Sequence, residues 1–174
     1  AASRAVAGLC PITESSLGDG IFNGISFRDC GGHFGVGSDS NIHIGLWEEL
    51  ATLDYSQRLR DLSRAAMATP DRSTGRYLFD ATTSAGAQAA GRFSGQIAEG
   101  KIADLMAVST DNEFLCNRSD DAVLDSLVFT GRGRNCVDDV WSAGRHMVKN
   151  GRHIHRERIV ARFIDVSKQL GQNT

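Results

Sequence analysis

Two short apolar runs decide the fold class: AVAGLC at residues 5–10 and HFGVG at residues 33–37. Pro11 stops the first run, because proline cannot donate a hydrogen bond to a β-ladder. The second run is rich in glycine, which suits a strand that lies close to another backbone or to a ligand. Both runs predict short strands, followed by polar loops at residues 12–20 and 38–41.

Helical patterns lie after each predicted strand. Residues 21–30 predict a short helix that a glycine pair ends. Leucines spaced three or four apart predict a longer helix from residue 46 to about 68, and small apolar residues predict another from about 74 to 90. This order of strands and helices indicates part of a parallel α/β fold. Two strands do not make a stable parallel sheet, so we expect further strands from elsewhere.

The composition changes near residue 93, where short predicted strands replace the helices. The apolar runs at 103–108 and 126–130 predict two strands. A hairpin is predicted around Ala143-Gly144-Arg145, and Asn150-Gly151 is a strong turn signal. Residues 159–170 fit either a terminal helix or a tail.

The charge balance excludes some classes of protein. Lys plus Arg number 19 and Asp plus Glu number 21, which gives a formal net charge of −2 in 174 residues. Proteins that bind nucleic acid normally carry a basic surplus, so we expect no nucleic-acid partner. No run approaches the roughly 18 apolar residues of a transmembrane helix, so we expect no membrane partner.

The cysteines and the amino terminus bear on the compartment. Cys10, Cys30, Cys116 and Cys136 lack the spacing of a zinc ribbon or redox motif, and we predict buried thiols in a reducing cytoplasm. Residues 1–10 are too short and too weakly charged for a signal peptide. An apolar run follows Ala1 almost at once, so we expect the chain to begin partway through a larger fold.

Two carboxylates follow the predicted strands. Asp39 comes just after the glycine-rich strand, where α/β barrels place active-site residues, so it can ligate a metal or move a proton. The alternative is that Asp39 caps a turn. Glu14 follows the earlier strand and can line the same mouth, unless it is simply a solvated loop carboxylate.

The other candidates carry weaker signals. His43 follows Asp39 by four residues and can face the same pocket, although the interpretation without a functional role is favoured. His153 and His155 are two residues apart, so on a strand they would share one face and could bind a metal together. The surrounding arginines and the preceding turn favour a solvated hairpin end instead. The glycines of residues 35–37 lack the remainder of a dinucleotide or phosphate-loop motif.

Several motifs together resemble the amidohydrolase superfamily. Many of its deaminases carry Cys-Pro-x-Ser-Asn where this chain has Thr13-Glu14 in the last two positions. The Thr-Glu variant is similar to the formimidoylglutamate deiminase family, and the likeness runs from about residue 5 to about 165. The matching stretches are LCPITE (9–14), LGDG (17–20), FGVGSDS (34–40), YSQRLRD (55–61), GAQA (86–89) and GKIADL (100–105).

The resemblance implies a particular architecture. Residues 1–92 would be the last two strands and helices of a (β/α)8 metal-dependent amidohydrolase barrel. Residues 93–160 would belong to a small β-sandwich, and residues 161–174 would be a carboxyl-terminal helix or tail. The family forms homodimers, so we expect a homodimer for the intact enzyme.

The resemblance also implies a hydrolytic reaction in histidine degradation. The family holds one divalent metal ion, usually zinc, with three histidines and an aspartate that matches Asp39. Hydrolysis would convert N-formimino-L-glutamate to N-formyl-L-glutamate and ammonia, with Asp39 as metal ligand and proton shuttle and Glu14 shaping the substrate pocket.

The matching histidines are absent from this chain, so we expect the 174 residues alone to be inactive. Two alternatives remain open. The chain can belong to another amidohydrolase deaminase, or it can be a non-catalytic module that needs a partner chain.

Overall fold

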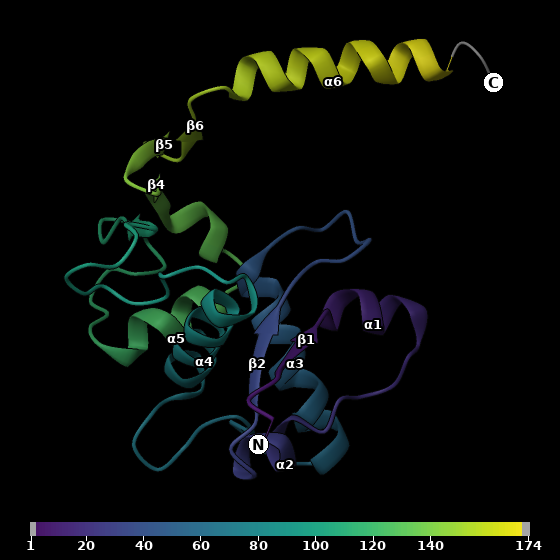
Figure 1. The fold of residues 1–174 in the computed structure, drawn as a ribbon, viewed down its shortest axis with the longest axis vertical. Helices are drawn as coiled ribbons and strands as arrows, with labels where there is room; N and C mark the ends of the chain where they lie inside the picture. Colours follow the sequence, from purple (N-terminus) through teal and green to yellow (C-terminus); the bar gives the residue numbers. More distant parts are fainter. Residues whose placement is uncertain (1–2, 172–174) are drawn as a thin grey trace.

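A central pair of parallel strands organises the first half of the chain in the computed structural model, which describes residues 3–171. Strand β1 (Val6–Leu9) pairs with β2 (His33–Val36), with Val6 opposite His33 and Leu9 opposite Val36. Figure 1 shows the two strands side by side, and the segments that follow them emerge at the same end. The two predicted strands are confirmed, and their parallel pairing places both polar loops together.

The first of these loops contains a helix, so the prediction of a loop over residues 12–20 was wrong. Helix α1 (Pro11–Leu17) has proline in its first turn, where the missing N–H costs nothing. Glu14 Oε1 accepts the N–H of Cys10 at 2.7 Å and so satisfies a donor at the helix start. Gly18 ends the helix in a left-handed conformation, with φ of 74°.

Three further helices surround the strand pair. Helix α2 (Gly24–Asp29) ends before the glycine pair, as predicted, and α4 (Thr74–Ala89) matches its predicted range. Helix α3 (Leu46–Asp61) ends earlier than predicted, because Leu62 adopts a left-handed conformation with φ of 52°. Helix α4 packs against β2, and a Cβ on Gly35 would lie only 3.3 Å from Gly86 Cα. The absence of a side chain at Gly35 therefore allows β2 to approach the backbone of α4 closely.

The predicted strand at 126–130 was also wrong. Residues Asp121–Phe129 form helix α5, which packs against α3 and α4. Leu124, Leu127 and Val128 are buried at helical spacing. A short apolar run does not by itself distinguish a strand from a buried helix, and here the contact with two other helices decides.

The remaining strands form one antiparallel sheet in the order β3-β4-β5-β6. The hairpin predicted around Ala143-Gly144 is confirmed, with both residues at positive φ, and Asn150-Gly151 forms the next turn. The other sheet within residues 3–171 is the parallel β1–β2 pair, so the β-sandwich expected for residues 93–160 stays a prediction. The strand bounds are β3 Leu105–Val108, β4 Val137–Ser142, β5 Arg145–Lys149 and β6 Arg152–His153.

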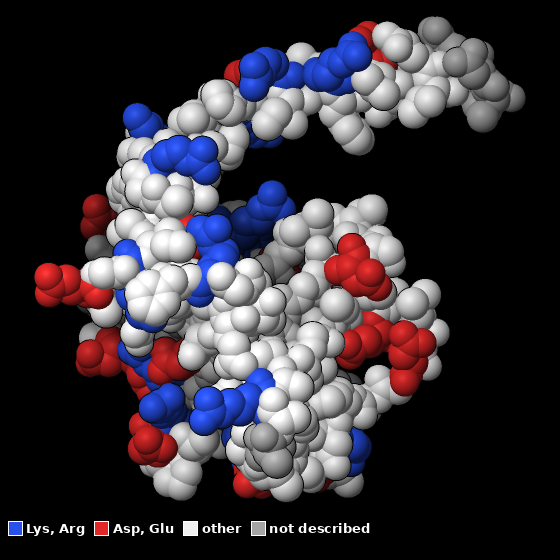
Figure 2. Space-filling view, viewed as in Figure 1, with Lys and Arg blue, Asp and Glu red and all other residues white. Residues whose placement is uncertain are grey.

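Helix α6 (Arg156–Gly171) confirms the helical alternative for the carboxyl-terminal segment. It projects away from the rest of the molecule in Figure 1, and none of its described residues is buried. Phe163 on this helix is 72% exposed. Lys and Arg side chains lie along the helix in Figure 2.

The core joins the two halves of the chain. Its largest buried side chains include Phe34 from β2, Leu50 and Leu53 from α3, and Leu127 from α5. Within residues 3–171, no helix combines the length and the apolar character that a membrane span requires.

The four cysteines are free thiols, as predicted. Their predicted burial holds for Cys136 and partly for Cys10, but Cys30 and Cys116 are exposed. Both exposed residues lie outside the helices and strands, where a thiol need not pack against the core.

Candidate functional site

The segments that follow β1 and β2 are joined by three hydrogen bonds. The N–H of Gly37 donates to Leu9 O at 2.9 Å and extends the parallel ladder by one residue. The Thr13 hydroxyl donates to Ser38 O at 2.8 Å, and Asn41 Nδ2 donates to the Ser16 hydroxyl at 3.3 Å. The start of α1 and the loop after β2 therefore form one unit at the carboxyl ends of the strands.

Asp39 lies in this unit, two residues after Gly37. Asp39 is exposed, and its backbone adopts a left-handed conformation with φ of 46°. The left-handed region costs a non-glycine residue energy, and such residues persist where surrounding contacts hold them. Asp39 is thus an accessible carboxylate at the edge of the sheet where parallel α/β folds bind ligands.

Glu14 lies on the neighbouring helix and is half-buried. Its hydrogen bond to the Cys10 N–H gives it a structural role at the start of α1. Burial raises the pKa of the Cys10 thiol, and the negative charges of Asp39, Glu14 and Glu49 raise it further. Cys10 therefore lies within the field of all three carboxylates.

Glu49 is the residue that sequence reasoning missed. It lies in the first turn of α3, is only 1% exposed, and its Oε2 accepts the N–H of Ile12 at 2.9 Å. Burial raises the pKa of Glu49 above its ordinary value, and the charges of Glu14 and Glu48 act in the same direction. Its position four residues before Leu53 places it on the buried face of α3, and that spacing was the available signal.

His43 adjoins this unit, because its N–H donates to Asn41 Oδ1 at 2.7 Å, whereas His153 and His155 lie on a distant hairpin. His43 is exposed, and its Nε2 lies 3.8 Å from a carboxylate oxygen of Glu48. His153 and His155 contact each other edge to face at the end of the β5–β6 hairpin. The structure thus brings Asp39 close to Glu14 and leaves the hairpin histidines elsewhere, as their sequence context favoured.

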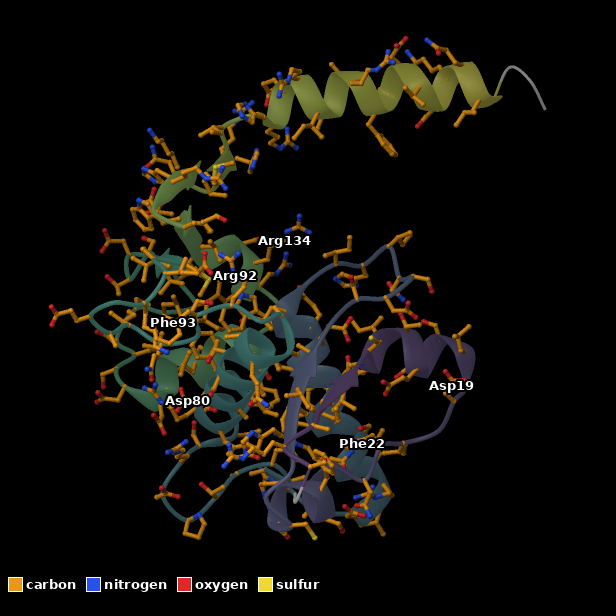
Figure 3. The ribbon with its side chains drawn as sticks, viewed as in Figure 1. Asp19, Phe22, Asp80, Arg92, Phe93 and Arg134 are labelled. Atoms are coloured by element: carbon orange, nitrogen blue, oxygen red, sulfur yellow. The ribbon has the colours of Figure 1, made fainter. Side chains whose placement is uncertain are left out.

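A second polar region lies beside α4. Figure 3 shows Asp80, Arg92 and Phe93 on the α4 side of the molecule, whereas Asp19 lies beyond α1. Arg92 pairs with Asp104 at 2.7 Å, and the Lys101 ammonium lies 3.6 Å from the centroid of the Phe93 ring. These cations already have partners and connect the segment after residue 91 to β3.

The donor set does not make a metal site by itself. No group of three or more His, Cys, Asp or Glu side chains within residues 3–171 is arranged to hold a metal ion. A catalytic zinc needs about three protein ligands, and Asp39 offers one exposed carboxylate. Asp39 by itself therefore does not complete such a site.

Comparison with known proteins identifies the family. Residues 1–147 match the model of the amidohydrolase family. The chain belongs to this family. The amidohydrolase chain is also 43% identical, over 171 residues, to formimidoylglutamate deiminase of Pseudomonas aeruginosa. That alignment covers 98% of this chain and 38% of the relative, so the chain spans less than half of the relative's length.

Solved structures agree with the family assignment. An amidohydrolase from Brucella melitensis has a TM-score of 0.86 and 44% identity, covering 97% of this chain and 36% of that one. An atrazine chlorohydrolase from Arthrobacter aurescens, solved with zinc, has a TM-score of 0.71 and 25% identity, covering 90% of this chain and 34% of that one. The amidohydrolase-superfamily fold with mixed α/β content is therefore established for this chain.

Proposed function

We propose that this amidohydrolase chain is the carboxyl-terminal part of an enzyme that hydrolyses N-formimino-L-glutamate to N-formyl-L-glutamate and ammonia in histidine degradation. The observation that carries the proposal is the position of Asp39 beyond a parallel strand, in a chain 43% identical to a formimidoylglutamate deiminase. The Thr13-Glu14 pair supports the same substrate, because it matches the Thr-Glu variant that resembles the formimidoylglutamate deiminase family.

The proposed architecture places this chain at the end of a barrel. Residues 1–92 supply the last two barrel strands and their helices, 93–160 contribute to a β-sandwich, and 161–174 form a terminal helix or tail. The parallel pairing of β1 and β2 supports the first assignment. The antiparallel sheet of β3 to β6 fits one layer of a sandwich.

The proposed chemistry centres on Asp39. A divalent metal ion, zinc by analogy with the relatives, would supply activation of water when ligands outside this chain complete its site. Asp39 would serve as one ligand and would carry the proton from the attacking water toward the leaving ammonia. Glu14 would shape the neighbouring substrate pocket while it holds the start of α1.

The proposed setting is the cytoplasm, with a homodimer as the intact assembly. The four free thiols support a reducing compartment. The homodimer rests on the family likeness.

The test compares Asp39→Asn with wild type in the intact enzyme that contains this chain. Removing a positioned proton-transfer group lowers kcat by about 10²–10⁴-fold, measured as ammonia release from N-formimino-L-glutamate. Asp19→Asn makes the same charge change on the exposed loop beyond α1 and should retain wild-type activity. An unaltered kcat for Asp39→Asn would overturn the role of Asp39.

A panel of other amidohydrolase substrates tests the reaction itself. Preference for another aminated substrate would replace the proposed reaction with that of another deaminase. Turnover by the isolated 174 residues would contradict the need for outside ligands.

A further inference from the structure

Glu49 is a buried carboxyl group that the proposed reaction does not use. It is 1% exposed, and its Oε1 atom is buried without a hydrogen-bond partner among the described residues. Burying a carboxyl group with one unsatisfied oxygen is unfavourable. A residue that provided packing alone would be better replaced by an apolar side chain, so the hydrogen bond that Glu49 does make needs an explanation.

That hydrogen bond connects helix α3 to the start of α1. Glu49 Oε2 accepts the Ile12 N–H at 2.9 Å, and Ile12 is the second residue of α1. The first N–H groups of a helix have no partner inside the helix, so an outside acceptor fixes where the helix begins. Glu14 satisfies the N–H of Cys10 from within α1, whereas Glu49 does so for Ile12 from another helix.

The next residue carries the connection to the loop of Asp39. The hydroxyl of Thr13 donates to Ser38 O at 2.8 Å, and Thr13 is only 4% exposed. Ser38 directly precedes Asp39, whose φ of 46° requires support from its surroundings. The path from α3 to Asp39 therefore consists of two hydrogen bonds and two short backbone links, Ile12–Thr13 and Ser38–Asp39.

We propose that Glu49 is a positioning residue for Asp39, acting through Ile12, Thr13 and Ser38. Glu49 fixes the start of α1, the Thr13 hydroxyl holds Ser38, and the loop then presents the Asp39 carboxylate in one orientation. This inference rests on the proposed function for the importance of Asp39. The experiment below uses no metal or substrate, so its failure is distinguishable from failure of the proposed reaction.

Amide hydrogen exchange of this chain, read residue by residue by NMR, tests the path. The N–H of Asn41 donates to Ser38 O at 3.0 Å and the N–H of Gly37 donates to Leu9 O at 2.9 Å, so both amides report on the loop. Glu49→Ala should speed their exchange by about tenfold or more. The N–H of Met67, which donates to Asp54 at 2.9 Å, is the internal control and should keep its rate.

Two conservative variants separate positioning from packing. Glu49→Gln keeps an oxygen acceptor for Ile12 and should restore wild-type exchange at both loop amides. Thr13→Val keeps the shape of Thr13 but removes its hydroxyl, so it should speed exchange at Asn41 and leave the Ile12 amide protected. It also tests the path if Glu49→Ala fails to fold.

Three results would overturn the proposal. In the first, Glu49→Ala speeds exchange at Ile12 but leaves Asn41 and Gly37 unchanged. In the second, exchange rises equally at Met67, which indicates general destabilisation. In the third, Thr13→Val leaves the Asn41 amide at its wild-type rate.

Discussion

The carboxylate of Asp54 accepts the backbone N–H of Met67 at 2.9 Å and ties the segment after α3 back onto that helix. Its other oxygen binds Arg58 Nε one turn along the helix. Asp54 is fully buried, and the guanidinium of Arg58 also lies over the rings of Tyr55 and Phe129. One carboxylate thus fixes both the end of α3 and the contact of α3 with α5.

Asp54→Ala should destabilise the fold by about 2–3 kcal/mol, because it leaves Arg58 and the Met67 N–H unpaired. The value is below that of a fully buried ion pair, since the Arg58 side chain is 31% exposed. Urea unfolding followed by tryptophan fluorescence measures the change. Asp61→Ala, which removes an exposed carboxylate beside Arg60, is the control and should leave the urea midpoint unchanged. Equal effects of the two variants would contradict this account.

Glu49 should make stability depend on pH. Its pKa in the fold is raised from 4.5, chiefly by burial, so the folded state favours the protonated form. Its contribution is fully present below the unfolded pKa and is lost as pH rises through the raised folded pKa. Glu49→Gln does not ionise, so its free energy of unfolding should rise relative to wild type as pH increases from about 4 to 8. Urea unfolding across this range measures the difference.

Asp121 provides a comparison of opposite sign. Hydrogen bonds from Arg76 and from the Ser73 N–H lower its pKa below the ordinary value. Its contribution is present above the unfolded pKa and is lost as pH falls, so Asp121→Asn should differ from wild type mainly at neutral pH. A Glu49→Gln difference that stays constant with pH would refute the assignment of the raised pKa.

Gly75 and Gly86 lie on the same helix but should respond oppositely to alanine. A Cβ on Gly75 would lie 2.6 Å from the backbone nitrogen of Asp125, so α4 and α5 must separate. Gly75→Ala should therefore destabilise by about 1–3 kcal/mol. A Cβ on Gly86 meets no described atom within 4 Å, and Gly86→Ala should stabilise by about 0.5–1 kcal/mol. Thermal unfolding of both variants measures these changes. A Gly75→Ala variant more stable than wild type would show that α4 and α5 can accommodate a methyl group at residue 75.

Helix α6 should be dispensable for the stability of the remainder. None of its described residues is buried, and Ile159 and Phe163 are exposed. A chain that stops after His155 should lose helical circular dichroism yet keep its free energy of unfolding within about 0.5 kcal/mol. A fall larger than this would mean that α6 packs against the body in solution.

Local patterns predicted much of the fold. The parallel strand pair, α2, α4 and the glycine-containing hairpin followed from spacing and turn residues. Residues 12–20 misled because their polar character outweighed Pro11 and Glu14, which together begin a helix. The run at 126–130 misled because its burial depends on α3 and α4, which no local window includes.

The candidate site also contains features that the sequence predicts and features that it does not. The position of Asp39 followed from the strand before it, since a parallel pair places both following loops at one edge. The importance of Glu49 could not be predicted in this way, because its hydrogen bond to Ile12 spans 37 residues of sequence. Thr13 was noticed as part of a motif, but its hydrogen bond to Ser38 required the folded arrangement of two strands.

The hydrogen bond between Thr13 and Ser38 has an evolutionary consequence. A mutation that removes the hydroxyl of residue 13 also withdraws support from the loop of Asp39. Selection on residue 13 therefore acts at the same time on the loop of Asp39, the proposed metal ligand, and the two positions do not drift independently. Lineages that exchange Thr13 should carry compensating changes near Ser38, where another donor or a shorter loop restores the lost support.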